Sequence, residues 1–203
     1  FWLDFPVSHA FSADVDGGGE VSISRAGAWL GVTVPFQTYN RFTLEMSSEW
    51  SFYDFNQAVG LDPAGGDPVG AVEEFQLGAR LFIRTATRWG VFGAAEIISA
   101  GEPGAAFSDT LRFTGYGGAR YWFSETLSMS GGVSARTRLE DSAFVAPFIT
   151  IDWQINDQWA LKTSERVLER GTNVALSYAS SEALRWSLSA GYEPREYRLD
   201  DSG

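Results

Sequence analysis

His9 is the only histidine of the chain and the first residue whose chemistry has to be weighed. It lies in PVSHAFSADV with Ser8 and Ser12 nearby, and a hydroxyl nucleophile needs a base that is itself oriented by an acid. No acid at a suitable spacing accompanies His9, and the chain contains no G-x-S-x-G elbow, phosphate-binding loop or metal-spaced histidine cluster. We predict no catalytic residue, metal or cofactor, and keep an enzyme that uses His9 as an alternative.

Carboxylates and arginines recur inside otherwise hydrophobic stretches, which is the second pattern of chemical interest. In RFTLEMSSEWSFYDF (41–55), an apolar parity that includes Leu44 and Met46 alternates with a polar parity that includes Glu45 and Glu49. This period of two predicts a β-strand with one apolar and one polar face. The same period predicts strands in 72–85, 89–99, 110–123, 126–137, 144–154, 173–180 and 183–193.

Three further segments leave alternatives open. EVSISRAGAWLGVTVPF (20–36) is predicted to be extended with a bulge, because Arg25 shares a parity with the apolar Trp29. QWALKTSERVLERG (158–171) fits either a strand that runs into a loop or a short helix. Since bacterial barrels close with an even number of strands, either residues 195–199 begin a twelfth strand or residues 4–15 form none.

The predicted connections alternate between two lengths. Short turns are expected near 37–40, 86–88, 124–125, 155–157 and 180–182, and longer acidic or Gly/Pro-rich loops at 56–71, 100–109, 138–143 and 168–172. Short turns on one rim and long loops on the other are typical of bacterial outer-membrane barrels. The fold class predicted for 1–203, taken as one domain, is all-β: an antiparallel up-and-down transmembrane β-barrel of about 10–12 strands.

Aromatic side chains lie near the predicted turns and loops. Two girdles at the membrane interfaces are expected, formed by Trp50, Phe52, Trp89, Tyr121, Phe123, Trp153 and Trp159. The clear strands run about 10 to 14 residues, longer than the usual strand of a soluble sheet and enough to cross a bilayer at a tilt.

In such a barrel the polar parity points into a lumen. The residues predicted to line it are Glu45, Glu49, Glu74, Glu96, Arg80, Arg84, Arg112, Arg120, Arg136 and Arg185. They would form either a cross-lumen network of ion pairs or a narrow aqueous pore. Acidic residues of the long loops, such as Asp62 and Glu102, are predicted to keep those loops solvated rather than to bind metal.

Composition excludes several classes of protein. The formal net charge of −11 argues against nucleic acid as a partner, and the absence of cysteine excludes disulfides and thiolate sites. Fourteen of the fifteen basic residues are arginine, which suits desolvated pairing with carboxylates. The sequence shows no signal peptide and no apolar run of the roughly 20 residues that a membrane helix needs, so we expect a mature chain or a fragment.

The closing segment LSAGYEPREYRLDD, together with the alternation and the acidic loops, resembles an uncharacterised, planctomycete-type family of bacterial outer-membrane β-barrels in which a "GY…R…RL" strand end recurs. The resemblance implies a porin-like fold in the outer membrane of a Gram-negative bacterium, and no catalytic residues. The implied partners are outer-membrane lipid, lipopolysaccharide and the barrel-insertion machinery. The chain ends in DDSG rather than in the aromatic residue common in such barrels, which is compatible with truncation.

The function expected from these patterns is a structural or small-solute channel protein with an Arg/Glu-lined lumen. Two alternatives stay open. One is an outer-membrane lipid-modifying barrel enzyme that uses His9. The other is a soluble β-barrel that binds an apolar ligand, which requires the apolar parity to face inward.

Overall fold

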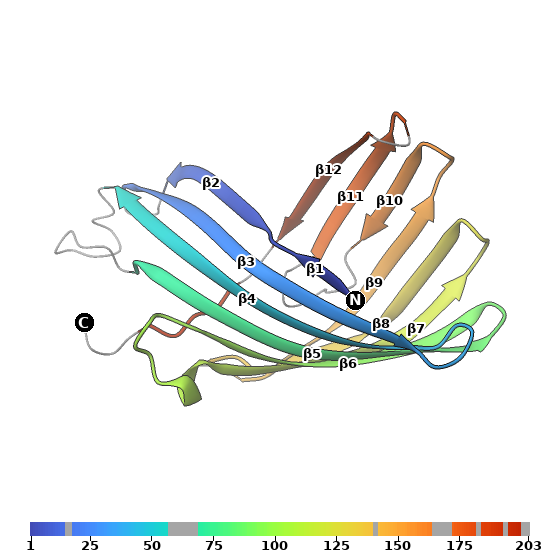
Figure 1. Cartoon of the computed structure of the whole chain (residues 1–203), viewed down its shortest axis with the longest axis horizontal. Coiled ribbons are helices and arrows are strands. Elements are labelled where there is room, and N and C mark those ends of the chain that lie inside the picture. Colours follow the sequence, from blue (N-terminus) through green and yellow to red (C-terminus); the bar gives the residue numbers. More distant parts are fainter. Residues whose placement is uncertain are drawn as a thin grey trace.

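The computed structural model describes residues 1–14, 18–56, 69–139, 142–163, 172–181, 184–192 and 195–199. Nearly all of the regular structure is β-strand (Figure 1). The elements are β1 (Trp2–Asp4), β2 (Val7–Asp14), β3 (Glu20–Pro35), β4 (Arg41–Asn56), β5 (Ala71–Ala86), β6 (Trp89–Gly101), a 3-10 turn η1 (Phe107–Thr110), β7 (Leu111–Trp122), β8 (Leu127–Arg136), β9 (Phe144–Gln154), β10 (Trp159–Thr163), β11 (Thr172–Ala179) and β12 (Arg185–Tyr192).

The strands form one twelve-stranded antiparallel sheet in which β3 to β12 follow one another in chain order. This confirms the predicted all-β, up-and-down architecture. At the first edge, β1 and β2 both pair with β3, β1 along its second half and β2 along its first. Pro6 separates the two pieces because proline lacks the N–H that a ladder needs. No helix in the described ranges is long and apolar enough to cross a membrane.

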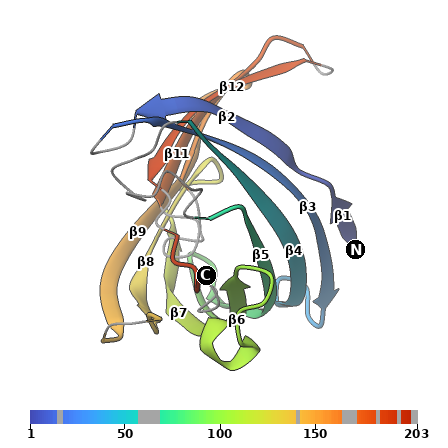
Figure 2. The ribbon, with the colours of Figure 1, turned by 90° about the vertical axis from the view of Figure 1, so that its left-hand side faces the viewer.

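The sheet is strongly curved but open, so the predicted closed barrel is not formed (Figure 2). Among the described residues no register joins β12 to β1 or β2. Strands β10 to β12 have 5, 8 and 8 residues, half or less of the 16 in β3, β4 and β5. Their short ladders leave the last hairpin splayed from the rest of the sheet (Figure 1).

The two rims differ as the sequence predicts. The hairpins β3–β4, β5–β6, β7–β8, β9–β10 and β11–β12 have short turns on one rim, and the long connections lie on the other (Figure 1). Polar side chains shape the short turns: Asn156 Oδ1 accepts hydrogen bonds at 2.9 Å from the N–H groups of Gln158 and Trp159. This is the Asx-type turn that an IND sequence favours.

Three local predictions are decided by the register. Strand β3 pairs with β4 without interruption from Glu20 to Pro35, so the predicted bulge is wrong: Arg25 and Trp29 share a parity because both face inward. The register shift lies in β2, between Ala10 and Ala13. Residues 4–15 do contain strand, whereas residues 195–199 form only an isolated bridge between Arg198 and Gly101. For 158–171, β10 confirms a strand, and 164–171 lies outside the described residues.

The faces of the sheet are reversed relative to a soluble protein. Leu44, Met46 and Phe52 are 48%, 44% and 52% exposed on the convex face. The intervening Thr43, Glu49 and Ser51 are 8%, 8% and 2% exposed on the concave face. An antiparallel sheet in water usually exposes its polar parity and buries its apolar one. The soluble ligand-binding alternative requires the apolar parity to face inward, and the structure has the opposite.

Glycines allow the sheet to curve at one point in particular. Gly118 of β7 and Gly132 of β8 are register partners. A Cβ on Gly132 would lie 2.2 Å from the carbonyl oxygen of Gly117 and 2.8 Å from Cζ of Phe148. The two backbones approach so closely here that no side chain fits between them.

Candidate functional site

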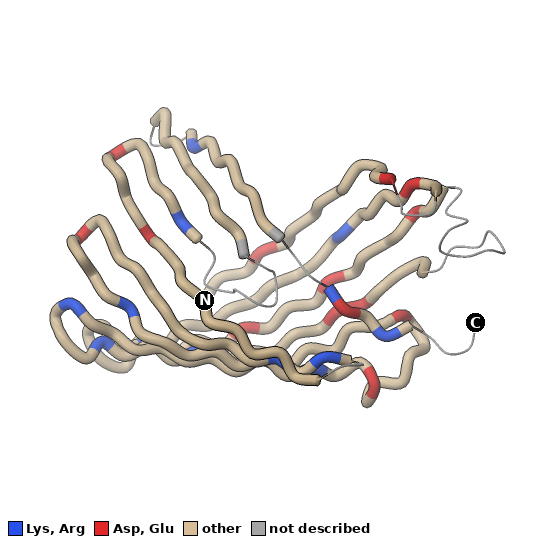
Figure 3. Tube along the Cα trace, turned by 180° about the vertical axis from the view of Figure 1, so that it is seen from behind, with Lys and Arg blue, Asp and Glu red and all other residues tan. Residues whose placement is uncertain are grey.

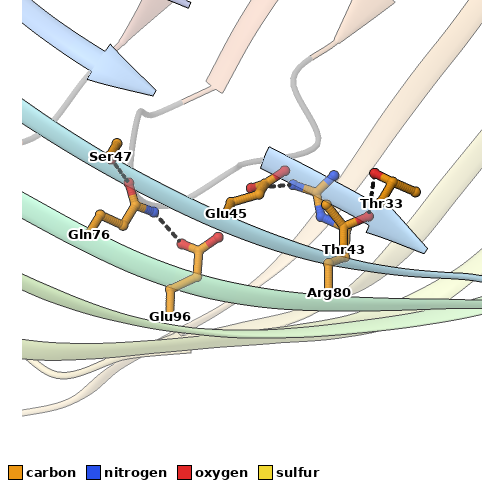
Figure 4. A network of polar contacts seen from close by, with 7 residues as sticks. All are labelled: Thr33, Thr43, Glu45, Ser47, Gln76, Arg80 and Glu96. Carbon is orange, nitrogen blue, oxygen red and sulfur yellow. Dashed lines mark hydrogen bonds and ion pairs between the residues drawn. The ribbon is translucent and has the colours of Figure 1, made fainter. Parts of the chain in front are cut away.

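The centre of the concave face carries a polar network built by β3, β4, β5 and β6 (Figure 4). Arg80 Nη2 lies 3.5 Å from Glu45 Oε2, and Gln76 Nε2 donates to Glu96 Oε2 at 2.9 Å. Ser47 Oγ donates to the side-chain amide oxygen Oε1 of Gln76 at 3.3 Å. The period of two places these side chains on one face. The antiparallel register sets Ser47 directly opposite Gln76, and makes Arg80–Glu45 and Gln76–Glu96 diagonal neighbours. Buried carboxylates at this position are therefore hydrogen-bonded or ion-paired.

Toward the long-loop rim, two carboxylates face each other. Glu49 and Glu74 are register partners on β4 and β5, an arrangement that is repulsive without a cation. Arg195 supplies the cation, with its Nη1 2.5 Å from Glu49 Oε1, and the Glu74 charge also acts on it. Burial lowers the pKa of Arg195, but Tyr197 and Glu49 raise it by more, so the guanidinium is held firmly in its charged form.

The rest of segment 195–199 is fixed by further contacts at the same rim. Glu196 Oε1 lies 2.9 Å from Arg138 Nε and 3.8 Å from Arg136 Nη2. The backbone of Arg198 bonds to Ala100 and Glu102, at 3.1 Å and 2.9 Å. Partial burial opposes ionisation of Glu196, yet the hydrogen bonds from Arg138 and the Leu139 N–H, with the nearby arginine charges, lower its pKa below the usual range. Segment 195–199 thus lies within the concavity (Figure 2).

At the short-turn rim the concave face carries arginines instead. Arg84 of β5 lies between the rings of Tyr39 and Trp122, with its guanidinium carbon 4.6 Å and 4.7 Å from their centroids. Arg120 of β7 donates from Nε to Ser130 Oγ at 3.0 Å. Arg41 of β4 lies over the ring of Phe82 at 4.9 Å. Figure 3 shows basic residues gathered at these hairpin ends, at its lower left.

All ten residues predicted to line a lumen lie on the parity that faces the concavity, but they do not form one cluster. Glu45, Arg80 and Glu96 lie at the centre, Glu49, Glu74 and Arg136 toward the long loops, and Arg84 and Arg120 at the short turns. Arg112 is only 7% exposed and has no hydrogen-bond or ion-pair partner among the described residues. Arg185 is exposed at the start of β12 and lies apart from the network.

The residues predicted to form aromatic girdles lie on the convex side. At the short-turn rim, the Tyr121 ring is 4.8 Å from those of Trp89 and Phe123, and the Trp159 ring is 4.7 Å from that of Tyr178. Trp153 is next to this group in the ladder, opposite Leu127 and Leu161. Trp50 and Phe52 are exposed toward the other rim. The aromatics therefore follow both rims of the sheet.

His9 lies on the exposed strand β2. Its Nδ1 is 3.0 Å from Ser24 Oγ, the residue opposite it in β3, and its ring packs edge-on against Phe11. The hydrogen bond thus joins His9 to a serine other than the two considered from the sequence. Within the described ranges, no carboxylate contacts His9 to orient it as a base.

Sequence reasoning missed the role of Arg195, Glu196 and Tyr197. The only signal was a dense run of charge after the last strand, and such a run does not identify its partners. No group of three or more His, Cys, Asp or Glu side chains that could hold a metal ion is found in the described part of the chain. Comparisons with protein-family models, with curated proteins and with solved structures find no match.

Proposed function

We propose that this chain is an outer-membrane β-barrel protein of a Gram-negative bacterium, a structural or small-solute channel without enzymatic activity. The observation that carries the proposal is the reversal of the two faces. A lipid environment stabilises Leu44, Met46 and Phe52 on the outside, and a polar interior suits Thr43, Glu49 and Ser51. The implied partners are outer-membrane lipid, lipopolysaccharide and the insertion machinery, and the resemblance to the planctomycete-type family is part of the same proposal.

The dimensions and rims of the sheet support this assignment. A transmembrane strand needs about 9 to 11 residues, and β3 to β9 each have at least 10. Short turns on one rim, long loops on the other and aromatics along both are typical of outer-membrane barrels. Since lipid does not tolerate an open sheet edge, the proposal requires the edges at β2 and β12 to pair in the membrane.

The interior would be narrow at the long-loop end. Segment 195–199 lies there, paired through Arg195 with Glu49 and through Glu196 with Arg136 and Arg138. A segment held in this place would narrow the passage and limit it to small solutes. If segment 195–199 blocks the passage completely, the protein is structural.

One observation favours the lipid-modifying enzyme as a second candidate, namely the contact between His9 and Ser24 on an exposed strand. A histidine base requires an orienting acid, and none contacts His9 among the described residues. Release of fatty acid from phospholipid vesicles, abolished by His9→Ala and by Ser24→Ala, would support the enzyme. Inactivity of the folded wild-type protein would exclude it.

The experiment that tests the channel begins with expression behind an outer-membrane signal sequence and membrane fractionation. Conductance of the detergent-purified protein is then recorded in planar bilayers. We expect recovery in the outer membrane and discrete conductance steps that Arg120→Ala and Glu45→Ala alter. A membrane-bound but silent protein would favour the structural role, and recovery in the soluble fraction without detergent would overturn the membrane assignment.

A further inference from the structure

Three arginines from three strands meet around a cavity at the short-turn rim of the concave face. Arg41 of β4, Arg84 of β5 and Arg120 of β7 line a cavity of about 390 Å³ together with the rings of Tyr39, Phe82 and Trp122. Its described lining includes no carboxylate. The centre and the long-loop end of the same face differ in composition, because Glu45, Glu49 and Glu196 lie among the arginines there.

Arg84 is held in place before any ligand arrives. The rings of Tyr39 and Trp122 both lie within cation–π distance of its guanidinium, and its Nε and Nη2 donate to the carbonyl oxygens of Ala86 and Thr87. Its backbone N–H donates to Asn40 Oδ1 at 2.8 Å. A guanidinium has five N–H donors, so the others stay available to a ligand, and a preordered side chain loses little entropy on binding.

Gly90 leaves room for the aromatic rings that contact the arginines of the cavity. Gly90 of β6 is the register partner of both Arg84 and Arg120, so the residue between the two arginines on that row has no side chain of its own. A Cβ at Gly90 would lie 2.7 Å from Cζ of Phe82 and 3.1 Å from Cη2 of Trp122. The rings that hold the arginines therefore occupy the room that a side chain would take, and the arginines face a common volume.

We propose that this arginine pocket, lined by Arg41, Arg84 and Arg120, binds the phosphate group of a small water-soluble solute. Guanidinium forks suit carboxylates and phosphates, but a carboxylate presents two oxygens in one plane. A phosphate dianion presents oxygens in several directions and carries twice the charge of a carboxylate, which suits a site lined by three arginines better. The cavity volume falls in the range of small-molecule sites.

The proposal names the class of solute for the proposed channel. It rests on the proposed channel function only for how the solute would reach the pocket. The pocket opens on the polar concave face, away from the exposed Leu44 and Met46 of the convex face. A phosphate in solution reaches it more directly than a lipid headgroup does. Binding does not require conduction, so the two ideas can fail separately.

The test is isothermal titration calorimetry of the detergent-purified full chain with inorganic phosphate, glycerol 3-phosphate and acetate. We expect saturable binding of both phosphates, at least about tenfold tighter than acetate. Arg84→Gln should weaken phosphate binding by about tenfold or more, and Arg84→Lys by less, since lysine keeps the charge but loses the fork and the stacking. Arg185→Gln is the matched control, because it removes the same charge from an exposed position outside the pocket.

Several outcomes would overturn the proposal. They are the absence of saturable phosphate binding, equal binding of acetate, or an equal loss in Arg84→Gln and Arg185→Gln. Displacement of phosphate by phosphatidic acid in the micelles would assign the pocket to a headgroup instead of a solute.

Folding of each variant is verified by heat-modifiable migration, and Arg120→Gln replaces Arg84→Gln if the latter does not fold. A silent protein that binds phosphate keeps the pocket and refutes the channel, and a conducting protein that does not bind refutes the pocket alone.

Discussion

Arg195 and Glu49, 146 residues apart in the chain, form an ion pair in which Nη1 lies 2.5 Å from Oε1. Both side chains are nearly buried, at 12% and 9% exposure. Their contact fastens the segment after β12 to the concave face of β4. It also neutralises one of the two carboxylates, Glu49 and Glu74, that oppose each other in the ladder.

Removal of Arg195 should be costly. Arg195→Gln leaves Glu49 buried beside Glu74, and we expect a loss of about 3 kcal/mol in the free energy of unfolding. Urea unfolding of the refolded protein measures it. The double variant Glu49→Gln/Arg195→Gln should recover much of that loss, because it removes the buried charge of Glu49 together with its ion-pair partner and ends the repulsion between Glu49 and Glu74. Lys162→Gln, which breaks the exposed pair with Asp152, is the control and should change stability by less than about 0.5 kcal/mol.

Acid should release segment 195–199. The lowered pKa of Glu196 means that its ionised form is stabilised by folding, so this contribution is complete above the ordinary glutamate pKa. It is lost as the pH falls through the lower folded value. A spin label on Leu199→Cys, in a chain that otherwise has no cysteine, should gain mobility as the pH falls below the ordinary glutamate pKa. In Glu196→Gln the spin label should already be more mobile at pH 7, and an unchanged spectrum in that variant would disprove that Glu196 holds segment 195–199 in place.

Arg112 should be dispensable for stability. It is buried on the concave face, and no described residue pairs with it, so its desolvation is not compensated. Arg112→Met should leave the free energy of unfolding unchanged or raise it by about 1 kcal/mol. Arg80→Met, which removes the partner of Glu45, should lower it. Chemical denaturation should therefore show a loss of stability in Arg80→Met and none in Arg112→Met, and a large loss in Arg112→Met would contradict the expectation.

The close approach of β7 and β8 should not tolerate a methyl group at Gly132. Gly132→Ala forces its Cβ against the Gly117 carbonyl, and we expect a loss of about 2 kcal/mol or more, or a failure to refold. Gly131→Ala is the adjacent control, because its Cβ would lie at an ordinary 3.7 Å from the Phe148 carbonyl. Refolding yield and urea midpoint compare the two. Equal effects would contradict a local steric cause.

The edges at β2 and β12 should pair in a membrane. Ala10→Cys on β2 is combined in turn with cysteine at Leu188, Ser189 or Ala190 of β12, and oxidised in lipid vesicles. Disulfides need Cα atoms within about 7 Å, so one register should cross-link efficiently within one chain. Disulfide-linked dimers on a non-reducing gel would instead mean that two copies share their edges. No cross-link in any register would leave the sheet open.

The local architecture follows from the sequence. Alternation at period two, with apolar, β-branched and aromatic residues on one parity, determines where strands form and which residues share a face, as in β4. Turn residues such as Asn156 determine where the hairpins reverse. These properties depend on residues a few positions apart in the chain, so they can be predicted without knowing how distant segments pack. The bulge prediction was wrong because it assumed that Trp29 faces outward, so that Arg25 on the same parity seemed out of place. Both side chains face inward.

Only the tertiary structure decides which residues from distant strands meet. The curvature of the sheet places Arg195 against Glu49, leaves Arg185 outside the network and brings Arg41, Arg84 and Arg120 around one cavity. The curvature of the sheet and the position of segment 195–199 depend on many strand pairs at once, because small differences in twist at each pair accumulate across the sheet. For that reason the alternation determines that each strand has a polar and an apolar face. Only the fold determines that the polar faces line one concavity and that β12 does not pair with β1 or β2.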